Sequence, residues 1–173
     1  MGAKGGTFVL PVTANAHRRT REEILSNWEQ MLQIFQYRTI VEPESAYLAA
    51  ERITDEELSN LQNLLDQSME QDCTREWFRA LDVKFHLAIA KASGNDHCEA
   101  AVRKIRTKIN PALDLMPYND EIRSVNCSVH YKILQALQAH DGHQSREVMK
   151  EHVSFSAEAI YTRLVALDEV GVK

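Results

Sequence analysis

The amino-acid sequence predicts an all-α protein that folds as an antiparallel bundle of six or seven helices. From Thr20 onward, apolar residues form stripes at helical spacing. Helix-ending signals, such as Ser93–Asn95 and the Asp141–Gly142 turn, divide these stripes into separate segments. Connections this short favour neighbouring helices that run in opposite directions.

Residues 1–16 differ from the rest of the chain. Glycines at positions 2, 5 and 6 precede a β-branched and aromatic run over residues 7–13, a pattern typical of a turn and a short strand. A single strand is not stable alone, so this one either pairs with a segment outside the sequence or is a disordered tail. The predicted organisation is a strand and linker over residues 1–16 and one helical domain over residues 17–173.

The helices of the first half are expected to begin at polar caps. Residues 20–23 and 54–57 both have the Thr-x-x-Glu pattern of a capping box, which marks a helix start. A helical segment is predicted between them, over about residues 24–52. Pro43 lies inside that segment and is expected to split or kink it.

The helices of the second half follow from similar signals. Thr74 is the expected N-cap of a helix that ends at Ser93–Asn95. Pro111 is expected to kink the next helix, and Pro117 breaks the chain after it. These helices are predicted over about residues 74–92, 96–115, 120–139 and 145–167.

The composition fits a single soluble domain. The chain has 173 residues, with 44% hydrophobic and 26% charged residues, which is ordinary for a globular protein. Three cysteines without a CxxC pair indicate free thiols in a reducing compartment, and we therefore expect a cytoplasmic protein. There is no apolar run of transmembrane length and no signal-peptide pattern.

Four polar residues stand on otherwise apolar helical stripes: Asp82, His86, His130 and His152. Asp82 and His86 are one helical turn apart and share a face. His130 and His152 each lie 11 residues from position 141, in the predicted turn. If their helices fold back on each other, both lie about 16 Å from the turn, at about 1.5 Å per residue. The two histidines should therefore meet at one height in the bundle.

A metal ion would explain these four buried groups. A single core histidine is more often a hydrogen-bonded core residue than a ligand, but burying four such groups without partners costs several kcal/mol in total. One divalent cation would satisfy them all, and imidazoles with one carboxylate suit Zn, Ni, Mn or Fe. Such a site would leave coordination positions free for water or a ligand.

The same residues resemble the ligand-binding C-terminal domain (FCD domain) of FadR-type regulators in the GntR family. The resemblance covers about residues 28–165, and residues 37–52 resemble that domain's first long segment. Residues 5–9 resemble the last wing strand of the family's winged helix-turn-helix domain, the rest of which is not in this sequence. The resemblance rests on an ordered set with its spacings: Asp82, His86, Ser93–Asn95, His130, Asp141 and His152.

The resemblance implies a divalent metal (Zn, Ni or Mn) held by the Asp and three His, and a small carboxylate effector. That effector, such as a sugar acid or a hydroxy or dicarboxylic acid, would bind the metal and an arginine that by position is Arg38. Guanidinium binds carboxylate through two parallel hydrogen bonds. Asn126 and Arg123 would line the same pocket. Alternatively, Arg38 forms a salt bridge with Glu42 or Glu44, and Asn126 and Arg123 lie on an exposed polar face.

The family also implies partners. We expect a homodimer that contacts DNA only through a winged-helix domain not present in this chain, under the control of the effector. The chain by itself should not bind DNA specifically, because its net charge is −5 and it offers no recognition helix.

The alternative function is that of a helical metal-dependent hydrolase or lyase using the same Asp/His3 site. An enzyme also needs a general acid or base near the metal, and the other residues on these stripes offer no good proton shuttle. We therefore expect a sensor and not an enzyme. The acyl-CoA-binding branch of the family lacks the metal set, so the four retained ligands argue against it.

Overall fold

The computed structural model describes residues 14–170, and the side chains of residues 17–166. All regular elements in this range are helices, so the predicted all-α fold is confirmed. The expected strand over residues 7–13 lies outside the described residues. The helices are α1 (Ala14–Ser26), α2 (Trp28–Ala50), α3 (Asp55–Met69), α4 (Arg75–Ala92), α5 (Asp96–Leu113), α6 (Asp120–Gln138), α7 (Gly142–Ser154) and α8 (Ser156–Val170).

Two breaks of one residue each set the number of segments. Asn27 separates α1 from α2, and Phe155 separates α7 from α8. Without these breaks, the described helices would form six continuous segments. Pro43 lies within α2 and does not split it, because the helix continues on both sides of the ring.

The polar caps are confirmed at two predicted starts and wrong at a third. The Thr54 hydroxyl accepts a hydrogen bond from the Glu57 backbone N–H, and the Glu57 carboxylate accepts one from the Thr54 N–H. Thr74 accepts from the Trp77 N–H and starts α4. Thr20 lies inside α1, which begins six residues earlier. The residues before Thr20 are already helical, so the local capping pattern does not start the helix.

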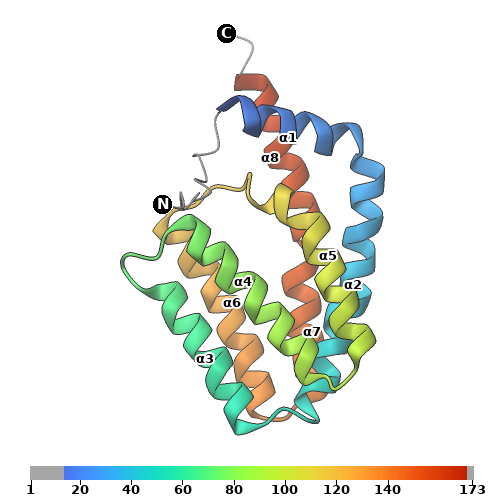
Figure 1. Cartoon of the computed structure of the whole chain (residues 1–173), viewed down its shortest axis with the longest axis vertical. Helices are drawn as coiled ribbons and strands as arrows, with labels where there is room; N and C mark the ends of the chain where they lie inside the picture. Colours follow the sequence, from blue (N-terminus) through green and yellow to red (C-terminus); the bar gives the residue numbers. More distant parts are fainter. Residues whose placement is uncertain (1–13, 171–173) are drawn as a thin grey trace, which may run out of the picture.

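The helices pack around two apolar clusters. One joins α2, α3, α4, α6 and α7, and is centred on side chains such as Phe85, Leu61 and Leu137. The other joins α1, α2, α5 and α8, with Phe35 and Ile109 at its centre. Figure 1 shows the long helices side by side, with α1 crossing one end of the bundle. None of the described helices combines the length and the apolar character that crossing a membrane requires.

The connection between α6 and α7 is tight and reverses the chain. His140 has a φ of 52°, in the left-handed region that ends helices. The Asp141 side chain then accepts a hydrogen bond from the Gln144 N–H and caps α7. This turn lies where the sequence predicted it, and it brings the inner faces of α6 and α7 together.

Candidate metal centre

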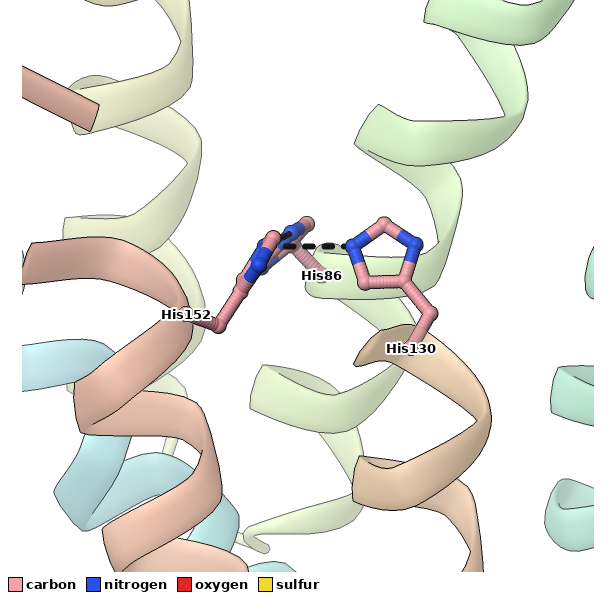
Figure 2. A group of neighbouring side chains, drawn as sticks. All are labelled: His86, His130 and His152. Atoms are coloured by element: carbon pink, nitrogen blue, oxygen red, sulfur yellow. Dashed lines mark hydrogen bonds between the residues drawn. The ribbon is translucent and has the colours of Figure 1, made fainter. Parts of the chain in front are cut away.

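Three imidazole rings from three helices converge between α4, α6 and α7 (Figure 2). The Nε2 atom of His152 lies 3.1 Å from Nε2 of His130 and 3.3 Å from Nε2 of His86. One ligand nitrogen from each ring can be chosen so that all three lie within 4.8 Å of one another. We call His86, His130 and His152 the histidine cluster. Its His130–His152 contact is the proximity that the 11-residue spacing from the turn predicts.

Each ring is held by the packing of its helix. His86 and His130 are buried, and the His130 ring stacks on Phe85 with centroids 4.7 Å apart. The His86 and His152 rings stack with an interplanar angle of 19°. These contacts restrict the ring orientations, and the three Nε2 atoms face a common point.

Asp82 lies at the edge of the histidine cluster. Its Oδ1 atom is 3.6 Å from Nε2 of both His86 and His130. Its Oδ2 atom forms an ion pair with the guanidinium of Arg106, which is buried on α5. One oxygen of the carboxylate thus faces the histidines while the other is bound to an arginine.

Arg38 and Glu42 form a buried ion pair on the other side of His86. The Arg38 Nε donates to Glu42 Oε1 at 2.7 Å, and both side chains are only 2% exposed. The other carboxylate oxygen, Oε2, lies 2.5 Å from Nδ1 of His86. Arg38 NH1 also donates to the Ser156 hydroxyl at 3.2 Å. The predicted alternative for Arg38, a salt bridge with Glu42, is therefore present.

The electrostatics favour neutral His130 and His152 beside ionised carboxylates. Burial lowers the pKa of His130 to about 3, against a partial opposing effect of Asp82. Burial, followed by His130 and His86, holds the pKa of His152 well below its usual range. Burial alone would raise the pKa of Asp82 and of Glu42, but the neighbouring arginines and His86 lower both. Neutral imidazole and ionised carboxylate are the forms that bind metals.

The spacing of the nitrogens fits a divalent transition metal. Two ligands about 2.0–2.1 Å from a tetrahedral zinc lie about 3.3–3.4 Å apart, and the two Nε2 separations of 3.1 and 3.3 Å are close to this. Three nitrogens and one nearby carboxylate oxygen are also a donor set that such metals accept. The residues present therefore fit the expected metal.

Asn126 and Arg123 form other contacts. The Asn126 side chain donates to the Ile122 carbonyl on its own helix. The Arg123 guanidinium donates to the Glu70 carbonyl at 2.6 Å and to the Asp120 carboxylate at 2.9 Å. These bonds place Arg123 between α6 and the end of α3, and the effector-binding role of both residues stays a prediction.

Two charged residues of the site were missed in the sequence. Glu42 was considered only as a partner of Arg38, and Arg106 was not considered. Glu42 lies one turn after Arg38, on the same face of α2, which was a usable signal. The sequence contains no signal of comparable strength for Arg106, because its partner Asp82 lies 24 residues earlier, on another helix.

The low histidine pKa values predict acid sensitivity of the metal-free protein. An unfolded histidine binds a proton near pH 6.5, whereas folded His130 does so only near pH 3. The unfolded state therefore binds more protons in this window, and the free energy of unfolding falls as pH decreases from 6.5 towards 3. The loss is about 2 kcal/mol at pH 5 for such a histidine. Urea midpoints at pH 7, 6 and 5 measure it.

This pH window separates the histidines from the carboxylates. Asp82 and Glu42 have lowered pKa values, so their contribution begins to be lost only below about pH 4 and disappears as pH falls through their folded-state pKa values. The exposed His97 supplies the control, and His97→Ala should keep the pH dependence that His130→Gln reduces. A urea midpoint that stays constant from pH 7 to pH 5 would contradict the buried neutral state of His130 and His152.

Comparison with known proteins gives a consistent picture. The sequence model of the protein family described as the FCD domain matches residues 33–155 of this chain. The Exu regulon transcriptional regulator of Escherichia coli K12 is 29% identical over 127 residues, which are 70% of this chain and 48% of that protein. The HTH-type transcriptional regulator YcbG of Bacillus subtilis, described as uncharacterized, is 29% identical over 136 residues, 79% of this chain and 55% of that protein.

The chain thus spans about half the length of the curated relatives it matches. These relatives are named as transcriptional regulators and not as enzymes, in agreement with the expectation of a regulator's domain instead of an enzyme. Among solved structures, E. coli McbR/YncC superposes with a TM-score of 0.71 at 23% identity, covering 78% of this chain and 66% of that one. Streptococcus agalactiae GntR gives 0.60 at 24% identity, covering 86% and 62%. At these identities, the structural likeness concerns the fold alone.

Proposed function

Because the chain belongs to the FCD domain family, we propose that it is the metal-dependent, carboxylate-sensing effector domain of a GntR/FadR-type transcriptional regulator. The proposal of a bound metal is supported by the convergence of three Nε2 atoms, with separations of 3.1 and 3.3 Å, beside an ionised Asp82. The bound metal would be Zn, Ni or Mn. Its chemistry here is that of a Lewis acid that holds an anionic ligand.

The charges around the histidine cluster support an anionic effector. Arg38 is paired with Glu42, and Arg106 with Asp82, so the two ion pairs are each neutral. The three histidines are the remaining ligands, and those with a lowered pKa, His130 and His152, add no charge. A divalent cation would therefore add two uncompensated positive charges to a buried site. A carboxylate bound to the metal offsets part of this charge.

Arg38 is the proposed second contact of the effector. Glu42 engages its Nε, and Ser156 accepts from its NH1. A guanidinium has five N–H donors, so donors of Arg38 remain for a carboxylate beside the metal. Asn126 and Arg123 are proposed to contribute more weakly. In the whole regulator, a homodimer of this domain would set the positions of two winged-helix domains, and the effector would change their DNA affinity through a coupling between sites.

The test of this function is a carboxylate-binding assay on Arg38→Lys. Alanine would leave the buried Glu42 carboxylate without its partner, whereas lysine keeps the charge and loses the planar fork. With metal-loaded protein and a panel of glycolate, malate and gluconate, at least one acid should raise the melting temperature of the wild type by mass action. Its dissociation constant should increase about tenfold or more in Arg38→Lys, with unchanged metal content.

The control is Arg146→Lys, in a pair with Glu44 that is partly exposed. This variant should keep the wild-type affinity. Equal carboxylate affinity in Arg38→Lys and wild type would remove Arg38 from the site, and a wild type that responds to no carboxylate would refute the effector class.

A further inference from the structure

Glu42 joins the two halves of the proposed site. Its Oε2 atom lies 2.5 Å from Nδ1 of His86, and its Oε1 atom accepts from Arg38 at 2.7 Å. All three side chains are no more than 2% exposed. The carboxylate therefore has two buried contacts: a charge-assisted hydrogen bond from Arg38 to Oε1 and a close approach of Oε2 to Nδ1 of His86.

The contact with His86 decides which ring nitrogen carries the proton. An ionised carboxylate only accepts hydrogen bonds, so the Nδ1 of His86 must be the donor. In the neutral form that binds a metal, the imidazole has a single N–H, and a proton on Nδ1 leaves Nε2 of His86 with a free lone pair. That Nε2 faces His152 at 3.3 Å and the Asp82 carboxylate at 3.6 Å.

The contact with Arg38 keeps Glu42 in this role. An unpaired carboxylate at this depth would take up a proton instead of staying charged. The Arg38 guanidinium, one helical turn before Glu42 on α2, supplies the compensating charge. A protonated or rotated Glu42 would no longer fix the orientation of the His86 ring.

We propose that Glu42 is a positioning residue of the metal centre, which holds His86 in the tautomer that presents Nε2 to the metal. This inference rests on the proposed function, because it gives Glu42 a role only if the histidine cluster binds a metal. Carboxylates placed behind ligating histidines in this way typically contribute tenfold to a hundredfold to metal affinity.

Glu42→Gln is the sharpest variant, because the amide has nearly the same volume but only one acceptor oxygen. If the oxygen turns to Arg38, the amide NH₂ faces Nδ1 of His86 and favours the tautomer with the proton on Nε2. If the oxygen turns to His86, the NH₂ opposes the Arg38 Nε–H. Either orientation disrupts one of the two contacts while leaving the packing in place.

The first measurement needs no metal and no variant. Two-bond ¹H–¹⁵N correlation spectra of the metal-free wild type report which nitrogen of His86 is protonated, with the resonances assigned by their loss in His86→Gln. The spectra are recorded at about pH 9, well above the ordinary histidine pKa, so that the neutral ring is observed. In this neutral ring we expect a protonated Nδ1 and a bare Nε2. A neutral His86 ring with its proton on Nε2 would overturn the inference, even if Glu42→Gln does not fold.

The second measurement is a titration with Ni²⁺, Zn²⁺ and Mn²⁺ by calorimetry, with circular dichroism to confirm folding. We expect Glu42→Gln to bind these metals ten to a hundred times more weakly than the wild type. The matched control is Glu44→Gln, two residues away on α2. Glu44 is 51% exposed and its partner Arg146 is 28% exposed. This variant should bind the metals with the affinity of the wild type.

The outcomes separate the two proposals. Folded Glu42→Gln with wild-type metal affinity would overturn the positioning role of Glu42 and leave the metal-dependent function standing. A wild type that binds neither Ni²⁺ nor Zn²⁺ nor Mn²⁺ would overturn the proposed metal dependence, and the role of Glu42 with it.

Discussion

His130→Ala is expected to abolish the thermal stabilisation that Zn²⁺, Ni²⁺ or Mn²⁺ gives to the wild type. His130 supplies one of the three converging nitrogens, 3.1 Å from Nε2 of His152. Metal that binds only the folded state stabilises it by about 2.7 kcal/mol at a concentration of 100 times the dissociation constant. Without His130, this increment should fall to nearly zero, and elemental analysis should find about one metal per wild-type chain and little in the variant.

The increment is the quantity to compare, because the substitution also affects the metal-free protein. The His130 ring is buried and stacked on Phe85, so its loss leaves a cavity that lowers stability by itself. His97→Ala changes an exposed histidine at the start of α5 and should keep the full metal increment. A His130→Ala protein that retains the wild-type metal content would show that the histidine cluster is not the site.

Arg106→Met should lower the free energy of unfolding by about 3–5 kcal/mol, the usual effect of removing one partner of a buried ion pair. The Arg106 side chain is 3% exposed and Asp82 is 12% exposed, so water cannot replace the lost guanidinium fully. Methionine keeps much of the side-chain length, which limits the cavity. Chemical denaturation in chelator-containing buffer measures this difference.

Arg103→Met is the matched control on the same helix. Arg103 pairs with Glu99 in an arrangement that is 61% and 29% exposed, and such pairs contribute about 0–1 kcal/mol. Added Zn²⁺ should stabilise Arg106→Met more than it stabilises the wild type, since the cation then replaces the lost positive charge of Arg106 beside Asp82. A loss below 1 kcal/mol for Arg106→Met would contradict the buried pairing.

The sequence predicted the parts of this site that depend on local periodicity. His130 and His152 could be placed at one height because a helix has a fixed rise, and because the Asp141–Gly142 turn marks the reversal. Helix type and most boundaries followed from the same patterns. No glycine or proline marks the break at Phe155 in the sequence. This break divides the single helix predicted over residues 145–167 into α7 and α8.

The charged residues around the histidine cluster were harder to predict. Which side chain pairs with Asp82 depends on how α4 and α5 pack, and no local spacing encodes that. Arg38 was found only through the resemblance to a family, and its burial in an ion pair with Glu42 depends on the packing of α2 against α4. Long-range pairs of this kind follow from tertiary structure, to which a single sequence gives little access.

The one-residue break at Phe155 makes α8 a lever arm. The break lies next to the site: His152 precedes it, and Ser156, which accepts a hydrogen bond from Arg38, follows it as the first residue of α8. The long arm is α8, about 22 Å long at 1.5 Å per residue, and just past its middle the Leu164 carbonyl accepts from Arg21 of α1. A tilt of about 3° at the joint would displace the far end of α8 by roughly 1 Å and Leu164 by roughly 0.7 Å. A movement of Arg38 towards the proposed ligand would therefore reach α1, the first described helix of the chain, through Ser156 and this arm.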